Sequence, residues 1–515
     1  GAANESARLN LAVLPEWEKK SPGAGRAALM KLPGMTESIA DAILDWIDPD
    51  DEPREYGAEV EYYSSLATPY APKNGPLETV EELLLVRGVT PELLLGCDAN
   101  RNAMVDPYES AGSGMVAVDG LECSMDRGWS AYLTLHSAET NKRSDGSDKI
   151  DLNQSDMEQL YAELEEALQN PRWAAFIVTL RQNGPYGSSS TPASIGPMGP
   201  QGDDGDTDGG YGGGEDSGRG GGGRGDGGRG DSGRGDSGNS LTLTPGMSLA
   251  ELMALVEQLR AQLGQGSTDP NEDLSNKSES ELQEMVTDLQ SKLGSAAGSE
   301  TEEEVGEPFP EDFEPDLSKA ATAEIASVLD LIGAKIQVEV DSEEGDGNGE
   351  KEKIVYQSPF SEEPGEIASY LSLLMEVLTT DTSEKIVGRV NINQASAAVL
   401  QGIPGITPET VDQILTSRQP DPIQADVTRR YATWILSEGL VTLDQMKQLM
   451  PYVTGAGSVY RVQVVGYFDR GGPAVRVEAV LDATTSPARL RSFRDLSHLG
   501  RGYGLETLGT ESAGL

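Results

Sequence analysis

A run of twelve residues that begins at Asp98 carries oxygen-bearing side chains at the spacing with which one loop wraps a calcium ion. Loop positions one, three, five, nine and twelve hold carboxylates or amides, and position seven offers its backbone carbonyl. The candidate ligands are Asp98, Asn100, Asn102, Met104, Asp106 and Glu109. The spacing therefore predicts a calcium site. A solvated acidic loop is the alternative, because position six is Ala103, where the sharp turn favours glycine.

A second acidic run lies upstream of this loop, between residues 45 and 59. Its carboxylates would repel one another in a packed turn unless a positive charge neutralised them. A bound cation would do so, with Asp48, Asp50 and Glu59 as its candidate ligands. The other interpretation is an acidic surface loop paired with Arg54.

The two cysteines of the chain, Cys97 and Cys123, bracket the predicted calcium loop. In an oxidising compartment they could form a disulfide that staples the loop, whereas in the cytosol they would remain thiols. The sequence leaves both states open.

The elements around the loop decide what a bound ion would do. A short helix is predicted at Pro91–Leu95, just before the loop, and Ala111-Gly112-Ser113-Gly114 follows it. Calcium sensors have a helix on each side of the ion, and the two helices swing on binding. Since no second helix is expected here, we predict that the ion acts as a static clip in a rigid subunit.

One short pattern occurs three times: an apolar residue, any residue, glycine, an apolar residue and threonine. The copies are L-P-G-M-T at 32–36, V-R-G-V-T at 86–90 and I-P-G-I-T at 403–407. Glycine allows the left-handed backbone that ends one helix, and threonine caps the next. The pattern is typical of helix-hairpin-helix units, which can offer backbone amides to a DNA phosphate. Few basic residues surround the copies, so we favour a compact packing unit.

Charge and composition bear on the same question. The 515 residues carry a formal net charge of −47, which disfavours a nucleic-acid partner and suits divalent-cation sites on an extracytoplasmic surface. The two histidines, His136 and His498, lie in no nucleophile or metal motif, and nothing pairs carboxylates for glycoside hydrolysis. We therefore expect no catalytic residues, no enzymatic activity and no small-molecule substrate.

The chain offers little that could enter a membrane. No apolar run reaches the length of a membrane span, and no signal peptide is evident. The sequence begins Gly1-Ala2-Ala3 without an initiating Met. We therefore expect a fragment whose upstream part, with a targeting or membrane segment, is missing.

Apolar periodicity predicts the elements that would position these sites. The predicted elements are a helix at Met157–Leu168, a strand or short buried segment at 173–181, a helix at 317–332, a strand at 335–340 and a helix at 366–378. Alternation by twos at 460–468 and 474–481 predicts an antiparallel hairpin.

Composition divides the chain into seven segments. They are 1–135, a first sheet segment with a helical domain that carries the acidic calcium-binding loops; 136–184, a helix and strand extension; 185–240, a disordered glycine-rich insert; 241–316, amphipathic helices at 248–263 and 280–293 with an acidic linker; 317–384, a small α/β segment; 385–499, a helix-hairpin-helix unit and the C-terminal β-hairpin; and 500–515, a tail.

Several of these runs resemble the minor pseudopilin K family of type II secretion systems. The strongest is D-A-I-L-D-W-I-D-P-D-D at 41–51, continued by E-P-R, G-A-E and Y-Y. T-P-Y at 68–70 with Asn74, and V-E-E-L-L-L-V-R-G at 80–88, are similar to the same family. R-L-N-L at 8–11 and R-V-N-I-N at 389–393 resemble its strand-to-helix segments. The resemblance covers residues 1–135 and 385–485 and leaves the glycine-rich and acidic middle as an insertion.

The resemblance implies an α+β fold, in which a pseudopilin-like antiparallel sheet carries a large inserted helical domain with helix-hairpin-helix units. The implied structural calcium lies in the acidic block, which matches Asp48, Asp50 and Glu59 only loosely. The implied protein is a non-enzymatic subunit at the tip of a short periplasmic pseudopilus. It assembles with minor pseudopilins I and J and contributes to protein export across the outer membrane.

One departure from the family concerns the long N-terminal helix by which pseudopilins insert and polymerise, because this chain lacks it. Anchoring in the inner membrane is therefore expected for the intact protein, with this fragment soluble and periplasmic. The alternative function is a helix-hairpin-helix protein that binds nucleic acid in a DNA-uptake system.

Overall fold

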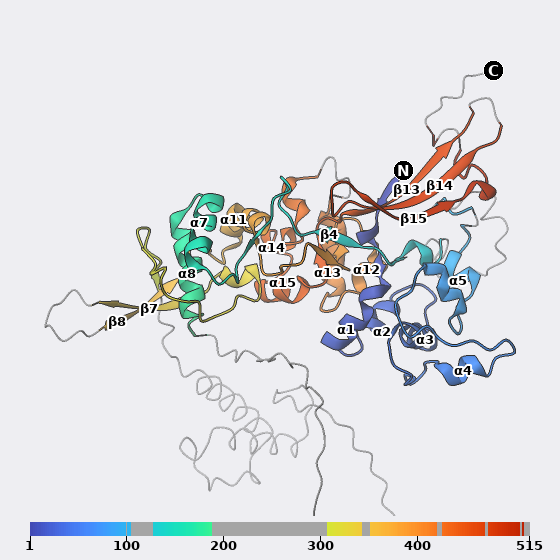
Figure 1. Cartoon of the computed structure of the whole chain (residues 1–515), viewed down its shortest axis with the longest axis horizontal. Coiled ribbons are helices and arrows are strands. Elements are labelled where there is room, and N and C mark those ends of the chain that lie inside the picture. The colour runs from blue at the N-terminus through green and yellow to red at the C-terminus, as the bar shows by residue number, and fades with distance from the viewer. Residues whose placement is uncertain are drawn as a thin grey trace, which may run out of the picture. The chain divides into compact units, whose positions relative to one another are not determined.

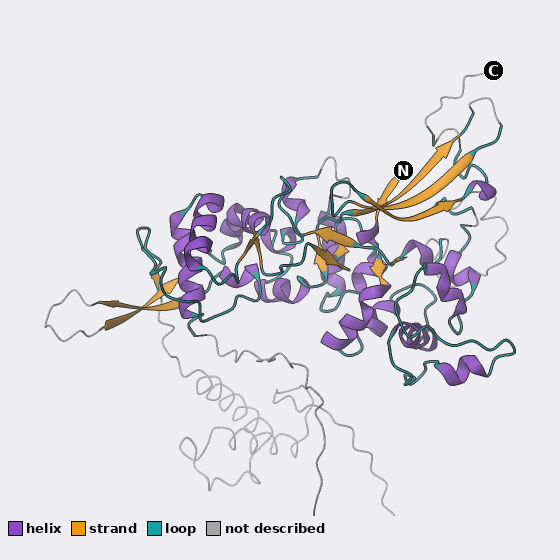
Figure 2. Ribbon diagram, in the orientation of Figure 1, coloured by secondary structure: helices purple, strands orange, loops and turns teal. Residues whose placement is uncertain are grey.

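The computed structural model describes residues 1–98, 100–102, 104, 127–187, 306–341, 351–419, 425–468, 472–504 and 507–508. Figures 1 and 2 show a mixture of helices and strands, which confirms the α+β class. One compact unit consists of Gly1–Gly187 and Gly306–Leu515. The predicted glycine-rich insert beyond residue 187 and the helices at 248–263 and 280–293 lie outside the described residues, as do Asp106, Glu109 and Cys123.

This unit has two antiparallel strand pairs, and the second pair lies within the stretch of chain that the first pair encloses. β1 (Ala2–Asn4) pairs with β13 (Val459–Gly466), so residues 5–458 lie between two neighbouring strands. Within that stretch, β4 (Ala138–Thr140) pairs with β10 (Lys385–Val387). The chain that joins β4 to β10 therefore begins and ends at this strand pair.

The C-terminal sheet has the order β1-β13-β14-β15, with β14 at Val475–Asp482 and β15 at Arg489–Asp495. β13 and β14 form the predicted antiparallel hairpin, which is confirmed (Figure 1). Side chains alternate across a strand, and on β14 the buried ones include Arg476, Glu478 and Asp482. The opposite face is apolar and open. Its members that are more than half exposed include Val464, Val475, Leu490 and Phe493.

Three short parallel strand pairs repeat one arrangement along the chain. They are β2 (Leu9–Asn10) with β3 (Leu133–Thr134), β5 (Ile150–Asp151) with β9 (Leu378–Thr379), and β11 (Val390–Asn391) with β12 (Val453–Thr454). In each pair the first strand leads into helices, and the second strand brings the chain back beside it.

Side-chain hydrogen bonds make the three pairs equivalent. The side-chain oxygen of Asn10, Asp151 or Asn391 accepts from the backbone N–H two residues later, at 2.9–3.0 Å. The threonine hydroxyl that ends each return strand also accepts from the N–H two residues later, at 3.1–3.2 Å. The described residues thus contain three copies of one module, and the middle copy lies between β4 and β10.

The helices of the first module are α1 (Leu14–Lys20), α2 (Ala24–Leu29), α3 (Glu37–Ile47), α4 (Val60–Ser64) and α5 (Pro91–Leu95). The middle module has α7 (Met157–Leu168), α8 (Pro171–Asn183), α11 (Pro364–Val377) and a small sheet of β6 (Glu307–Pro308), β8 (Lys351–Gln357) and β7 (Lys335–Asp341). The last module has α12 (Ala397–Gln401), α13 (Pro408–Ser417), α14 (Trp434–Ser437) and α15 (Leu443–Leu449). One continuous apolar core runs through all three modules.

Of the two interpretations of residues 173–181, the strand is wrong, because these residues belong to the buried helix α8. Asn170 caps the helix by accepting from the N–H of Trp173 at 3.2 Å, and Pro171 occupies its first turn. Residues 174–182 of this helix are all buried. A helix buried on every side has no apolar periodicity, so its sequence resembles that of a buried strand.

The predicted helix at 317–332 is also wrong: only a 3-10 turn at Val328–Leu331 forms. Before it, residues 316–319 form a turn in which the N–H of Lys319 donates to the carbonyl of Asp316 at 3.1 Å, and the amide of Gln182 on α8 donates to the carbonyls of Asp316 and Lys319 at 2.7 and 3.0 Å. Helix α8 therefore satisfies backbone groups that a helix would otherwise have bonded internally.

The three glycine–threonine turns have the local geometry that the sequence predicts. Gly34, Gly88 and Gly405 have φ of +68°, +82° and +81°. Thr36, Thr90 and Thr407 each cap the following helix through the hydroxyl. A fourth such turn joins α14 to α15, through Gly439 at φ +71° and the capping residue Thr442. The sequence pattern missed it because its glycine and threonine lie one residue further apart.

Candidate metal centre

Helix α3 directs three carboxylates at the segment that follows it. Asp41, Asp45 and Asp48 recur at helical spacing, and their residues are 0 %, 0 % and 8 % exposed. Thr36 fixes the start of the helix, and Asp48 is its C-terminal cap. The sequence therefore buries a row of acids that must find partners.

Arg54 and backbone N–H groups are some of the partners of these carboxylates. Asp45 accepts from the N–H of Ala58 and from Nη1 of Arg54, both at 2.7 Å. The same Nη1 donates to Asp48 at 2.5 Å. Asp41 is paired with Arg26 at 2.6 Å. The surface-loop interpretation expected pairing to Arg54, and this part of it is found, although these carboxylates are buried.

Glu59 has no such compensation among the described residues. It is 3 % exposed, and neither of its oxygens has a hydrogen-bond partner. One oxygen of Asp48 is also buried without a partner. Burial, followed by the charges of Asp45 and Asp48, raises the pKa of Glu59 to about 7. Unsatisfied carboxylate oxygens in a negative field are what a hard cation binds, so these residues fit calcium.

Asn74, which lies outside the loop between α3 and Glu59, forms hydrogen bonds with that loop. The amide of Asn74 donates to the carbonyl of Asp50 and to the carboxylate of Asp51, both at 2.7 Å. The other atom of that amide, Oδ1, is buried without a hydrogen-bond partner. Asp50 itself is exposed. Of the predicted ligands, the fold thus brings Asp48 and Glu59 into one charged cluster and leaves Asp50 at the solvent edge.

Sequence reasoning overlooked Asp45 as a member of this cluster, although its helical spacing from Asp41 and Asp48 was a usable signal. Across the described residues, no three His, Cys, Asp or Glu side chains are arranged to hold a metal ion by themselves. Calcium in proteins takes six to eight oxygens, many of them from carbonyls, amides and water. Asn74 is a candidate for such a contribution.

The first half of the predicted twelve-residue loop is buried and folded on itself. Asp98, Asn100 and Asn102 are 8 %, 6 % and 3 % exposed. The carboxylate of Asp98 accepts from the N–H of Asn102 at 2.9 Å, and the Asn102 amide oxygen accepts from the N–H of Met104 at 2.7 Å. The second half, with Asp106 and Glu109, lies outside the described residues, so this site stays a prediction.

The loop is also fastened to the polar side of the C-terminal sheet. Arg476 on β14 donates to the carbonyl of Asn100, and Gln463 on β13 donates to the carbonyl of Arg101 at 2.8 Å. The hydroxyl of Tyr503 donates to the carbonyl of Asn102 at 3.1 Å. No local sequence signal linked these strands to a loop that precedes them by more than 350 residues. Cys97, just before the loop, is half-buried, and its pairing with Cys123 remains a prediction.

The acidic turn leaves no room for a side chain at residue 57. A Cβ on Gly57 would lie 1.8 Å from a carboxylate oxygen of Asp45, which Ala58 and Arg54 hold in place. We expect Gly57→Ala to destabilise the protein by about 1–3 kcal/mol, in the range of other overpacking substitutions. Chemical denaturation would measure the change. Gly75→Ala is the matched control, because its nearest atom would be 3.8 Å away. Equal effects of the two substitutions would contradict the packing of Gly57 on Asp45.

Comparison with known proteins places the acidic turn in a family. Among the described residues, no helix has both the length and the apolar character needed to cross a bilayer. Neither a curated protein nor a solved structure matches the chain. Residues 7–96, which hold α1 to α5 and the acidic turn, match the family model described as type II secretion system (T2SS), protein K. The resemblance found in the sequence is therefore confirmed for residues 7–96, which are similar to the type II secretion protein K family.

Proposed function

We propose that this protein is a non-enzymatic minor pseudopilin at the tip of a type II secretion pseudopilus, where it contributes to protein export across the outer membrane. The family match over residues 7–96 supports a role in type II secretion. Its proposed partners are the minor pseudopilins of the I and J types and the rest of the secretion machinery. The nested strands β1 and β13 support a pseudopilin sheet from which a large helical domain projects.

The open apolar face of the C-terminal sheet is the observation that carries this proposal. Val464, Leu490 and Phe493 on this face are 57 %, 58 % and 60 % exposed. A sheet face of this kind is normally buried against a second layer. We propose that the long N-terminal helix characteristic of pseudopilins covers it in the intact protein. The helix would also anchor the protein in the inner membrane, with the modules on the periplasmic side.

The position of β1 is consistent with such a helix. β1 is an edge strand that starts at Ala2, and the amino group of Gly1 donates to the carbonyl of Gln463 at 3.2 Å. A helix joined to Gly1 would thus enter at the edge of this sheet. Cysteines placed at residue 464 and along the helix of the intact protein should crosslink under mild oxidation. Val427, which is 82 % exposed and lies in a 3-10 turn of the last module, is the control position and should not crosslink. Equal crosslinking at both positions would refute the packing.

We further propose that a structural calcium ion lies in the acidic turn, held by Asp48 and Glu59 with Asp50 at its edge. The ion would supply the positive charge that the buried oxygens of Glu59 lack. A second ion in the loop that starts at Asp98 remains part of the proposal. The helix–turn–helix segments closed by Gly34, Gly88 and Gly405 are proposed to be helix-hairpin-helix units that serve packing.

Reconstitution with purified partners tests the proposed function. The full chain, mixed with soluble I-type and J-type minor pseudopilins, should elute from size-exclusion chromatography as one complex with all three proteins in equal amounts. Fluorescent duplex DNA is the second arm of the test. Tight, salt-sensitive binding to DNA together with no complex would favour the nucleic-acid alternative and overturn the proposal.

A further inference from the structure

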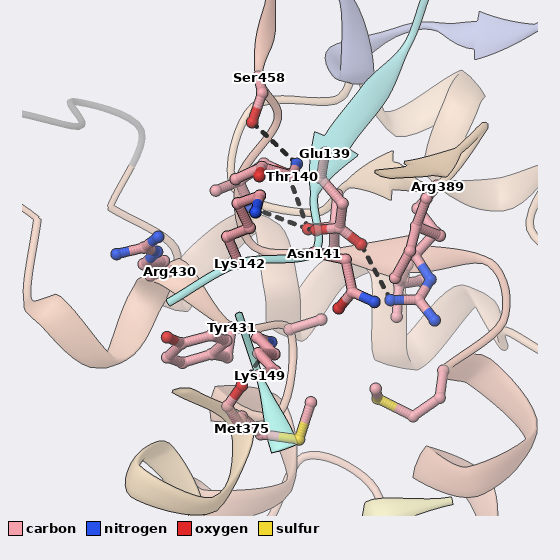
Figure 3. Close-up of a pocket in the computed structure, with 16 residues that line it drawn as sticks. Glu139, Thr140, Asn141, Lys142, Lys149, Met375, Arg389, Arg430, Tyr431 and Ser458 are labelled. Carbon is pink, nitrogen blue, oxygen red and sulfur yellow. Dashed lines mark hydrogen bonds and ion pairs between the residues drawn. The ribbon is translucent and has the colours of Figure 1, made fainter. Parts of the chain in front are cut away.

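A cavity of about 80 Å³ lies where the middle module joins the last one. β4 and β10 form part of its wall, and the last module contributes β12 and the 3-10 turn at Val427–Arg430. Figure 3 shows Arg430 and Arg389 on opposite sides of the view, with Lys142 and Glu139 between them and Tyr431 and Lys149 below. The cavity thus lies at the point where the chain leaves for the middle module and returns from it.

The charge of this cavity is opposite to that of the protein. Lys142, Lys149, Arg389 and Arg430 line it, and Glu139 is the one acidic side chain in the lining. Four basic groups thus surround a small space in a chain with a net charge of −47.

Carboxylates compensate three of these basic groups. Lys142 pairs with Asp148 at 2.5 Å, and Arg389 pairs with Glu139 at 2.9 Å. Arg430 has a longer contact of 4.0 Å with Glu376. The carboxylate of Glu376 is itself occupied by the Ser144 backbone and by the hydroxyl of Tyr431. At 4.0 Å, the contact with Arg430 is the longest of the three.

Two of these basic side chains have hydrogen-bond donors that could accept a further partner. The ammonium group of Lys149 donates to the carbonyl of Met375 at 2.7 Å, and no carboxylate among the described residues forms an ion pair with it. The Nε–H of Arg389 is buried and has no hydrogen-bond partner within the described structure. Burial lowers the pKa of Lys149, although the charges of Glu139 and Glu376 act in the opposite direction and the ammonium group lies 5.7 Å from the centre of the Tyr431 ring.

The rest of the lining selects the kind of anion. Met375, Ile386, Met450 and Val453 give the cavity apolar walls beside its basic groups. A guanidinium group presents a planar edge that matches a carboxylate, whereas the small volume disfavours bulky, highly charged anions. A carboxylate on a short apolar stem would satisfy both parts of this lining.

We propose that this cavity is a binding site for a carboxylate group, which Lys149 and Arg389 hold and Arg430 faces. The stem of the ligand lies against the apolar wall. Two sources share this chemistry: a free short-chain carboxylic acid, and an acidic side chain of a polypeptide. The inference is independent of the proposed role in secretion, because it uses the junction of the modules and not the sheet face or the acidic turn.

The test is an NMR titration of the full chain, which follows the arginine Nε–H and lysine ammonium signals. Sodium butyrate should produce saturable shifts of the Arg389 and Lys149 signals with a Kd on the order of millimolar. Sodium chloride at equal ionic strength should not. Lys149→Met should weaken butyrate binding at least tenfold, on the scale of about 1.4 kcal/mol. Lys447→Met is the matched control, because Lys447 has a side chain 31 % exposed and is paired with Asp330 outside the cavity. It should leave binding unchanged.

If Lys149→Met fails to fold, Arg430→Gln gives a second test. The Arg430 side chain is 36 % exposed, so its replacement should disturb the fold less. It should also weaken butyrate binding. A blocked glutamate peptide distinguishes the two sources: tighter binding than butyrate assigns the site to a polypeptide, and weaker binding assigns it to a free acid. Shifts that do not saturate, or that persist unchanged in Lys149→Met and Arg430→Gln, would overturn the proposal.

Discussion

Replacing Glu59 by Gln is expected to stabilise the calcium-free protein and to destabilise the calcium-loaded one. Without the ion, the carboxylate of Glu59 is buried, has no hydrogen-bond partner among the described residues and is repelled by Asp45 and Asp48. The amide removes that repulsion at nearly the same volume. With the ion, the substitution removes a charged ligand. Binding to the folded state alone contributes about 2.7 kcal/mol at a hundredfold excess of ligand over Kd, and this gain should shrink in Glu59→Gln.

Denaturant unfolding in calcium at about 1 mM, the upper end of the Kd range of extracellular calcium modules, and in excess chelator measures both changes in stability. Glu52→Gln is the control, because Glu52 lies in the same turn but is exposed. It should change neither curve by more than about 0.5 kcal/mol. An equal calcium response of wild-type protein and Glu59→Gln would remove Glu59 from the proposed site. No calcium response in the wild type would remove both proposed sites.

The pH dependence of the calcium-free protein follows from the same residue. The pKa of Glu59 is raised from 4.5 to about 7, so the folded state holds a proton that the unfolded state has lost between these values. Stability therefore falls as the pH rises through this window. Glu59→Gln should flatten that decline, which unfolding curves in chelator at a series of pH values would reveal.

The sequence allowed turns, helix caps and charge clusters to be predicted where they depend on residues close together in the chain. Gly34 and Thr36 close a turn by backbone conformation and a cap, and both were predicted. Mutual repulsion between carboxylates within one turn pointed to Asp48 and Glu59. These arguments need only a few consecutive residues, because helix caps and close charges act over short distances.

Contacts between distant segments could not be predicted in this way. The docking of Asn100 on Arg476 joins residues that no periodicity links. The middle module escaped detection for a related reason. Its first strand begins after Lys149, where the other modules have arginine, and it carries Asp151 in place of asparagine. Only the parallel pairing of Ile150 with Leu378 makes the likeness plain.

A replacement of Glu5 by Gln is expected to cost about 3–5 kcal/mol of unfolding free energy, the range found when one partner of a buried ion pair is removed. Glu5 is fully buried between β1 and the first module. It accepts from Arg461 of β13 at 2.8 and 3.2 Å and pairs with Arg8 at 3.3 Å. The hydroxyl of Thr134 also donates to it. Gln would keep the shape but leave two guanidinium groups without their shared negative charge.

The pH dependence of this effect separates the ion pairs from simple packing. Burial alone would raise the pKa of Glu5, but Arg8 and Arg461 outweigh it and hold the pKa below its usual value of 4.5. A carboxyl group with a lowered pKa stabilises the fold above its unfolded pKa, and this contribution is lost as the pH falls through the folded value. The difference between wild-type protein and Glu5→Gln should therefore be full at neutral pH and shrink in acid.

Urea unfolding at neutral and acidic pH measures both the size and the pH dependence of the Glu5 effect. Glu16→Gln is the matched control, because Glu16 forms an ion pair with Lys19 at 2.9 Å but has a side chain 61 % exposed. Exposed pairs contribute about 0–1 kcal/mol. A large and pH-independent loss of unfolding free energy in Glu5→Gln would indicate that the packing around residue 5 matters more than its charge. A loss no greater than that of Glu16→Gln would mean that the strand pair β1–β13 holds the first module without this buried carboxylate.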